Sequence, residues 1–133
     1  MLNRIGLVER SECSFCNVNV ETLIHFFSEC QYVDRLWVEV REWININTGL
    51  EITFTTENKL FGFGGINNSA LNCITMLVRY EIYVCKIRKI IPRFDLCKYS
   101  IREYYDREKF IARNNHKLQV FQKKWCLFRH LFS

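Results

Sequence analysis

The clearest pattern of apolar positions in the chain runs from residue 31 to residue 47. Apolar side chains recur there at steps of three and four, the spacing that places them on one face of an α-helix. The stripe consists of Val33, Leu36, Trp37, Val40, Trp43 and Ile44. Gly49 follows at a position where helices commonly end. The pattern predicts one long helix with a single buried face.

Three further helices are expected in the second half. The first covers about 69–91, is apolar on most sides at its start, and is stopped by Pro92. The second covers about 95–114, and a last helix follows the break at 114–116. Apolar residues recur in each of them, so the three helices are able to share a core.

The segment between the two halves has a less regular pattern of apolar and polar residues. Residues 50–55, "LEITFT", alternate and are rich in β-branched side chains, which predicts a short strand or an extended connector. Residues 57–69, "ENKLFGFGGINNS", contain most of the glycines but no Gly-Lys-Ser/Thr ending, so a phosphate-binding loop is not indicated. We interpret this stretch as a turn between two substructures.

The composition supports a folded, mainly α protein. The chain has 133 residues, 49% apolar and 15% aromatic, which is enough for a core. The N-terminus is charged and lacks an apolar run, so no signal peptide is indicated. The most apolar window, 70–87, contains Arg79, Glu81 and Lys86 and is a poor membrane span. We therefore expect no membrane partner and an intracellular location, nuclear or cytoplasmic.

The net charge of +5 hides an asymmetry between the halves. Residues 1–66 hold five Lys and Arg against nine Asp and Glu, whereas residues 67–133 hold fourteen against five. A half this basic favours a polyanionic partner, RNA or DNA, although the cations are also compatible with ordinary solvated helix faces. The candidate phosphate contacts are Lys86, Arg88, Lys89, Arg93, Lys98, Arg102, Lys123 and Lys124. Tyr99, Tyr104 and Tyr105 are candidates for base stacking, or else core residues at helical spacing.

The stretch "SECSFCNVNVETLIHFFSEC" carries four residues of metal-ligand type within 18 positions: Cys13, Cys16, His25 and Cys30. A Cys-x2-Cys pair and a His-x4-Cys pair supply the thiolates and imidazole that Zn²⁺ prefers, and four such ligands make a closed, structural site. Positions five apart on an α-helix point about 140° away from each other. The chain must therefore bend between His25 and Cys30. The alternative is that the cysteines are core residues and His25 a satisfied polar one.

The remaining cysteines favour a reduced compartment over a disulfide framework. The total of seven is odd and no secretory signal is present. Cys73, Cys85, Cys97 and Cys126 stand singly in apolar, helical surroundings, which is typical of small buried side chains. Taken together, the patterns predict a zinc-binding domain over 1–50, a linker with a possible short strand over 51–66, and a basic helical region over 67–133.

The residues from Cys13 to Trp37 resemble a known family. Their order, Cys-x2-Cys, then Glu-Thr-x2-His-Phe-Phe, then Cys-x6-Trp, is similar to the zinc-binding domain that follows the reverse transcriptase of LINE-type (non-LTR) retrotransposons. The basic, tyrosine-containing segment "LVRYEIYVCKIRKIIPRFD" and the terminal "KKWCLF" are similar to elements found after that motif. The resemblance implies a C-terminal module of a polyprotein that engages element RNA or target DNA, with the four residues above as ligands.

The resemblance does not extend to catalytic motifs. No Tyr-x-Asp-Asp sequence occurs, and Asp34, Asp95 and Asp106 are isolated from one another. A Cys30–His25 nucleophile pair would compete with the metal for the same side chains. We therefore expect a non-enzymatic module. The alternatives are a structural or protein-interaction domain that docks on the upstream polymerase through Trp37 and Trp43, or an inert remnant of a mobile element.

Overall fold

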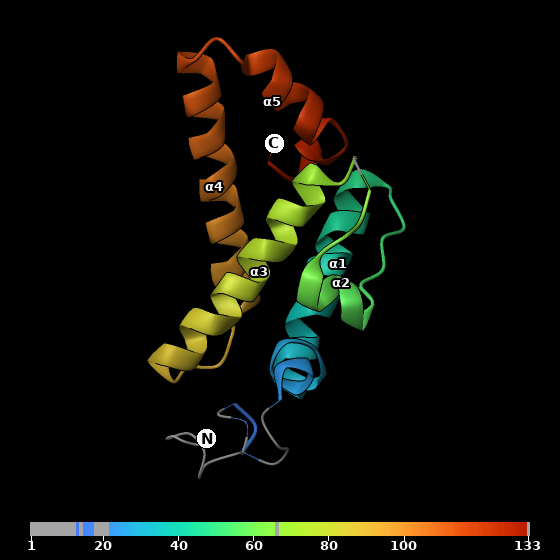
Figure 1. Cartoon of the computed structure of the whole chain (residues 1–133), viewed down its shortest axis with the longest axis vertical. Helices are drawn as coiled ribbons and strands as arrows, with labels where there is room; N and C mark the ends of the chain where they lie inside the picture. The colour runs from blue at the N-terminus through green and yellow to red at the C-terminus, as the bar shows by residue number, and fades with distance from the viewer. Residues whose placement is uncertain (1–12, 14, 18–21, 66, 133) are drawn as a thin grey trace.

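The computed structural model describes residues 13, 15–17, 22–65 and 67–132 (Figure 1). The extended lead-in expected over residues 1–12 lies outside this part. The described elements in chain order are the π-helix η1 (His25–Glu29), α1 (Gln31–Thr48), α2 (Thr56–Phe61), α3 (Ser69–Arg88), α4 (Phe94–Asn114), α5 (Leu118–Trp125) and the 3-10 helix η2 (Cys126–Leu131). No strand occurs among these residues. The predicted mainly α fold, with a long helix after the Cys-Cys-His-Cys unit and three basic helices after it, is confirmed.

The long helix α1 follows the predicted pattern. Its six buried residues are the six of the predicted stripe. Gly49 ends the helix in the left-handed conformation, with φ of 76°, and its N–H donates to the Asn45 carbonyl. The Trp37 indole N–H donates to the Phe27 carbonyl at 2.8 Å and so connects α1 to η1.

The segment after α1 is an extended connector and not a strand. Both backbone hydrogen-bonding groups of Ile52 pair with the Asn45 side chain, at 2.9 and 3.0 Å, which satisfies them without a neighbouring strand. The interpretation of 57–69 as a turn is wrong for its first part, which belongs to α2. There Thr55 and Asn58 form a reciprocal capping box that starts the helix.

Helix α3 ends three residues earlier than predicted. Lys89 adopts the left-handed conformation at φ of 58°, and the N–H of Ile90 donates back to the Cys85 carbonyl at 3.0 Å. This C-terminal cap terminates the helix before Pro92 is reached. Helix α4 runs from Phe94 to Asn114, one residue longer at its start than predicted.

One hydrophobic core joins the two halves of the chain. Residues of α1, α3, α4, α5 and η2 belong to a single buried cluster. Trp43 of α1 lies edge-on to Phe94, with ring centroids 5.9 Å apart, and to Phe132 after η2, at 6.4 Å. In Figure 1, η1 lies at one end of the molecule and the turn between α4 and α5 at the other. No described helix is long and apolar enough to cross a membrane.

Candidate metal centre and basic surface

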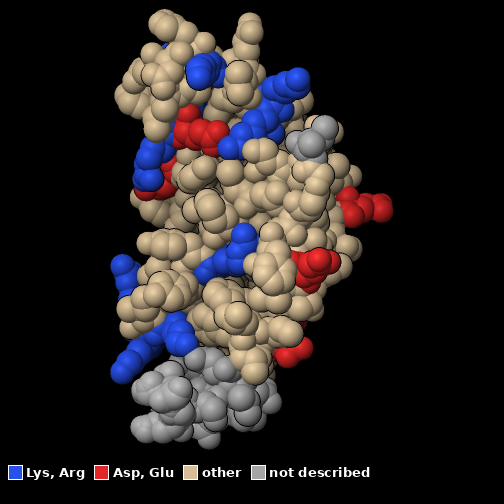
Figure 2. All heavy atoms as spheres, in the orientation of Figure 1, with Lys and Arg blue, Asp and Glu red and all other residues tan. Residues whose placement is uncertain are grey.

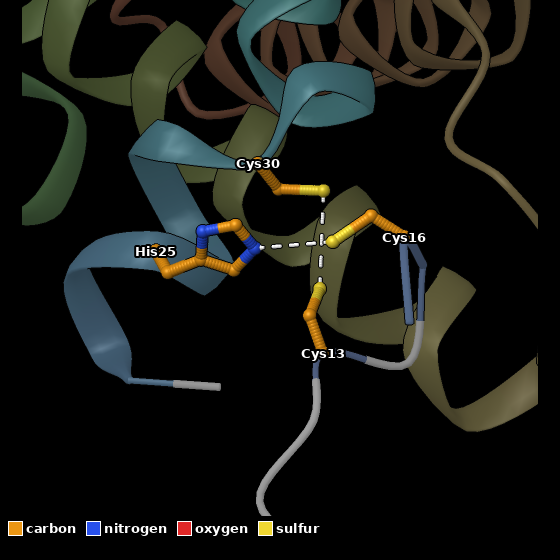
Figure 3. Close-up of side chains that lie close together, drawn as sticks. All are labelled: Cys13, Cys16, His25 and Cys30. Atoms are coloured by element: carbon orange, nitrogen blue, oxygen red, sulfur yellow. Dashed lines mark hydrogen bonds between the residues drawn. The ribbon is translucent and has the colours of Figure 1, made fainter. Parts of the chain in front are cut away.

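Four side chains that the sequence singled out converge on one point. One potential ligand atom from each of Cys13, Cys16, His25 and Cys30 lies within 4.8 Å of all the others (Figure 3). The Cys13 and Cys30 sulfurs are 3.8 Å apart, and the Cys16 sulfur is 3.5 Å from Nε2 of His25. A single metal ion placed among them would be within reach of all four, so the group could hold a metal.

A π-helical turn produces this convergence. The N–H of Cys30 donates to the carbonyl of His25 at 2.8 Å, an i to i+5 bond that brings residues five apart onto the same side. Cys30 then leaves the helical conformation, with ψ of 135°, and its carbonyl accepts the first bond of α1 from Asp34. The predicted bend between His25 and Cys30 is confirmed. The hydroxyl of Thr22 accepts a hydrogen bond from the N–H of His25 at 3.0 Å, which orders the start of the turn.

The cluster is shielded from solvent. Cys13, Cys30 and His25 are buried, and the stacked rings of Phe15 and Phe26 lie beside them with centroids 5.4 Å apart. Burial, together with the neighbouring Cys13, raises the pKa of the Cys30 thiol to about 12. A thiolate in these surroundings therefore needs a cation to compensate its charge. The donor set of three sulfurs and one imidazole provides a suitable site for a metal cation.

Six of the eight candidate phosphate contacts lie on two helices that pack together and on the turn between them, and one of the six, Lys86, lies beside the candidate metal centre. Helix α3, the turn after it and the first half of α4 carry Lys86, Arg88, Lys89, Arg93, Lys98 and Arg102, all exposed except the half-buried Lys86. We call these six residues the α3–α4 basic patch. The ammonium of Lys86 lies 4.7 Å from the centroid of the Phe26 ring, so the patch begins directly beside the residue that follows His25.

The other two candidates lie on α5, at the opposite end of the molecule. The Lys124 ammonium pairs with both carboxylate oxygens of Glu108, at 3.1 and 2.9 Å, and so connects α5 to α4. Lys123 is exposed. Figure 2 shows Lys and Arg atoms over the lower end of α3 and again over the upper ends of α4 and α5. The structure does not bring all eight candidates together.

The three tyrosines that were candidates for base stacking differ in their exposure and contacts. Tyr99 is exposed, and its hydroxyl donates to Glu103 at 2.9 Å. Tyr104 accepts a hydrogen bond from the Cys73 thiol, and Tyr105 stacks on Phe132 with centroids 3.9 Å apart. Of the three, Tyr99 alone presents an open ring, whereas the other two contribute to packing.

A cavity of about 600 Å³ lies between α4 and α5. Three cations line it: Lys109 from α4, Lys123 from α5 and Arg129 from η2. Lys109 and Arg129 could not be recognised as neighbours from the sequence, because they are twenty positions apart on different elements. Their combination with a neighbouring aromatic cluster follows from the way α5 folds back on α4.

The tryptophans proposed as docking anchors belong to the core. Trp37 is 1% exposed and Trp43 is 8% exposed, so neither presents a ring to a partner. Comparison with known proteins adds no relative: no family model, no curated protein and no solved structure matches this chain.

Proposed function

We propose that this protein is a non-catalytic zinc module that binds RNA or DNA through its basic helices. The observation that carries the metal assignment is the geometry of the cluster. A tetrahedral Zn²⁺ with Zn–S distances of about 2.3 Å and a Zn–N distance of about 2.0–2.1 Å requires sulfur–sulfur edges of about 3.8 Å and a sulfur–nitrogen edge of about 3.5 Å. The Cys13–Cys30 and Cys16–His25 distances of 3.8 and 3.5 Å match two of the six edges of such a tetrahedron, and all four ligand atoms lie within 4.8 Å of one another.

The role assigned to zinc is structural. Cys13, Cys16, His25 and Cys30 would fill all four positions of a tetrahedral ion and leave none for a substrate. The burial of three of the four supports the same role. The ion would hold the Cys13–Cys16 segment against η1 and the start of α1, and its binding would contribute directly to folding.

The α3–α4 basic patch supports the nucleic-acid partner. Arg88, Lys89, Lys98 and Arg102 are exposed cations without an ion pair in the part of the chain that the structure describes. Phosphate contacts from such side chains position a protein on nucleic acid and make its affinity dependent on salt. Because Lys86 contacts Phe26, the metal centre would also support the geometry of this patch.

The resemblance of residues 13–37 to the zinc-binding domain of LINE-type retrotransposons supports a specific context. In this proposal the chain is a C-terminal module of a reverse transcriptase polyprotein, and its partner is the element RNA or the target DNA. The module would contribute binding, while the polymerase and endonuclease chemistry would belong to other parts of the polyprotein.

Fluorescence anisotropy with a labelled RNA hairpin, measured with zinc-loaded protein at two salt concentrations, tests the nucleic-acid function. We expect binding that weakens steeply as salt rises, because phosphate contacts release counterions. A Kd weaker than ~10⁻⁴ M at the lower salt concentration, outside even the non-specific range, would refute the proposal.

A second candidate function is docking on the upstream polymerase, and the outer face of α3 favours it. Met76, Tyr80, Tyr83 and Ile87 recur there at steps of four, three and four, and all four are exposed. A helix that is apolar on its outer face as well as its core face is typical of one that is covered by a partner. A Tyr80→Lys/Tyr83→Lys variant that keeps its RNA affinity and loses binding to the polymerase would favour this second function.

A further inference from the structure

Four exposed apolar side chains share the outer face of α3. We call them the α3 outer stripe: Met76, Tyr80, Tyr83 and Ile87. Their steps of four, three and four place them on one side of the helix over about 16 Å, at about 1.5 Å per residue. The buried residues of α3 lie on the opposite side of the helix. The stripe is therefore a surface that the core of the molecule does not use.

The two tyrosine rings of this stripe are accessible. Tyr80 is 63% exposed and Tyr83 is 52% exposed. Among the described residues, neither ring has a hydrogen-bond partner or an aromatic neighbour. By contrast, Tyr105 is stacked on Phe132 with ring centroids 3.9 Å apart. The rings of Tyr80 and Tyr83 are open for stacking by a ligand.

Cations border the stripe. Arg79 and Lys86 lie four residues before and three residues after Tyr83, so they are its neighbours along one edge of the helix. Arg88 and Lys89 follow at the end of the helix, where both are exposed. In Figure 2 the lower half of α3 presents uncharged atoms with Lys and Arg atoms beside them. The stripe thus continues into the α3–α4 basic patch.

This charge distinguishes between possible occupants of the stripe. The one carboxylate of α3, Glu81, contacts the Cys85 thiol at 3.4 Å and is directed away from the stripe. Two copies of the chain that met through their stripes would bring Arg79 and Lys86 of both copies together, which like-charge repulsion opposes. An anion that also carries flat rings complements the cations and the tyrosines together. An unpaired nucleic-acid strand is such an anion.

We propose that the α3 outer stripe binds an unpaired segment of RNA or DNA, with one base stacked on Tyr80 and one on Tyr83. The cations beside the stripe contact the phosphates. Helix residues three apart have Cβ atoms about 5–6 Å apart, a wider spacing than the rise of about 3.4 Å per nucleotide in a duplex strand. Neighbouring bases therefore reach both rings only in an extended strand. The inference rests on the proposed nucleic-acid function and adds to it a preference for single strands.

Fluorescence anisotropy with a labelled uridine decamer and zinc-loaded protein tests the stacking. Tyr80→Ala and Tyr83→Ala should each weaken decamer binding about 5- to 150-fold, the range expected when one base loses its stacking ring. Tyr83→Phe keeps the ring and should bind as the unsubstituted protein does. Phe110→Ala is the matched control, because Phe110 is 62% exposed on α4 and lies outside the stripe. Both tyrosines are exposed, so their removal leaves the core packing unchanged.

Photo-crosslinking shows whether bases contact these rings directly. A decamer that contains 5-iodouridine is irradiated with the zinc-loaded protein, and mass spectrometry locates the crosslinked residues. Crosslinks at Tyr80 and Tyr83 are expected. Crosslinks confined to other residues overturn the inference, even if the alanine substitutions weaken binding, because the tyrosines would then act only through the structure of α3.

The outcomes separate this inference from the proposed function. An RNA duplex that binds as tightly as the decamer overturns the preference for single strands. Decamer binding that is insensitive to both alanine substitutions overturns the inference and leaves the proposed function intact. If the same variants also lose binding to the upstream polymerase, the stripe belongs to a protein partner. Absence of binding to the hairpin and to the decamer overturns both the inference and the proposed function.

Discussion

At the scale of single residues, the metal centre depends on the local geometry of His25 and Cys30. In an α-helix these two side chains would diverge by about 140°. The π-helical bond between their backbones and the extended ψ of Cys30 remove that divergence. Side chains with the spacing of His25 and Cys30 can therefore share a site only where the backbone departs from the α-helix in this way.

Replacing one ligand should release the metal. Cys16→Ser is expected to lose the single equivalent of zinc, because the hydroxyl is a poor ligand and Cys16, being half-buried, contributes less to packing than Cys13 or Cys30. Zinc content by mass spectrometry and far-UV circular dichroism measure the effect. Cys126→Ser, a substitution at an exposed thiol, is the control and should keep its zinc. A Cys16→Ser protein that retains one equivalent would rule out the four-ligand site.

Burial should also rank the thiols by reactivity. Desolvation and the hydrogen bond to Glu81 raise the pKa of Cys85 to about 12, and burial raises the pKa of Cys97 as well. A raised pKa leaves less thiolate at pH 8, and the thiolate is the form that reacts. Iodoacetamide should therefore modify Cys126 first and leave Cys85 and Cys97 intact in folded protein. Early modification of Cys97 would contradict the packing of α3 against α4.

At the scale of elements, one carboxylate ties α4 to α5. Glu108 accepts hydrogen bonds from the Lys124 ammonium and from the Trp125 indole. In its ion pair with Lys124, the Lys124 side chain is 20% exposed and the Glu108 side chain 27%. The i to i+4 pair of Glu103 and Arg107 on the same helix is 47% and 68% exposed. Because solvent screens the second pair more, the first should matter more for stability.

Two alanine substitutions compare these pairs. Glu108→Ala should lower the free energy of unfolding by about 2 kcal/mol, the range for hydrogen bonds to charged groups. Glu103→Ala should change it by less than about 1 kcal/mol, as is typical of exposed ion pairs. Urea denaturation of the zinc-loaded proteins measures both. Equal effects would mean that the α4–α5 contact does not depend on Glu108.

The α3–α4 basic patch should determine the salt dependence of RNA binding. Arg88→Glu is expected to weaken binding to the labelled hairpin and to reduce the slope of log K against log[salt] by about 0.7–0.9 for each phosphate that is no longer neutralised. Arg113→Glu, with the same change in net charge on α4 outside the patch, is the control. An equal change in slope for both variants would indicate that net charge acts without a defined patch.

At the scale of the whole molecule, the metal centre lies at one end of a core that continues beyond it. The first turns of α1 border the cluster, while Trp43 further along the same helix packs against Phe94 and Phe132. Helices α3 and α4 meet through buried residues such as Ile82 and Ile101, which need no metal. The proposed metal would therefore stabilise one end of the molecule, while apolar packing holds the rest of the core.

Chelation should separate these two parts. Removing the metal is expected to abolish amide protection in η1 and the first turns of α1, and to leave α3 and α4 protected, because apolar packing holds them. Hydrogen exchange with mass spectrometry before and after chelation measures the change, and zinc added back should restore protection. Uniform loss along the chain would show that the metal centre and the core unfold as one unit.

The sequence was sufficient wherever a local pattern decides the structure. The stripe of α1 was predicted residue by residue, because helical periodicity and a glycine stop depend on neighbours within a few positions. The four potential ligands were recognised for the same reason, since they lie within 18 positions and converge in the structure. Helix α2 was missed because the capping box of Thr55 and Asn58 starts a helix in spite of the glycines that follow. Helix α3 ends earlier than predicted because Lys89 adopts a left-handed conformation, which the position of Pro92 does not indicate.

What the sequence alone determined is the long helices α1, α3 and α4 and the last helix, α5, together with the buried face of α1 and the four residues that could hold a metal. The tertiary structure decided which cations share a surface. It separated Lys123 and Lys124 from the α3–α4 basic patch, engaged Lys124 with Glu108, and placed Lys109 beside Arg129. The physical reason is that charge is a property of single residues, whereas a binding surface depends on how helices distant in sequence pack together.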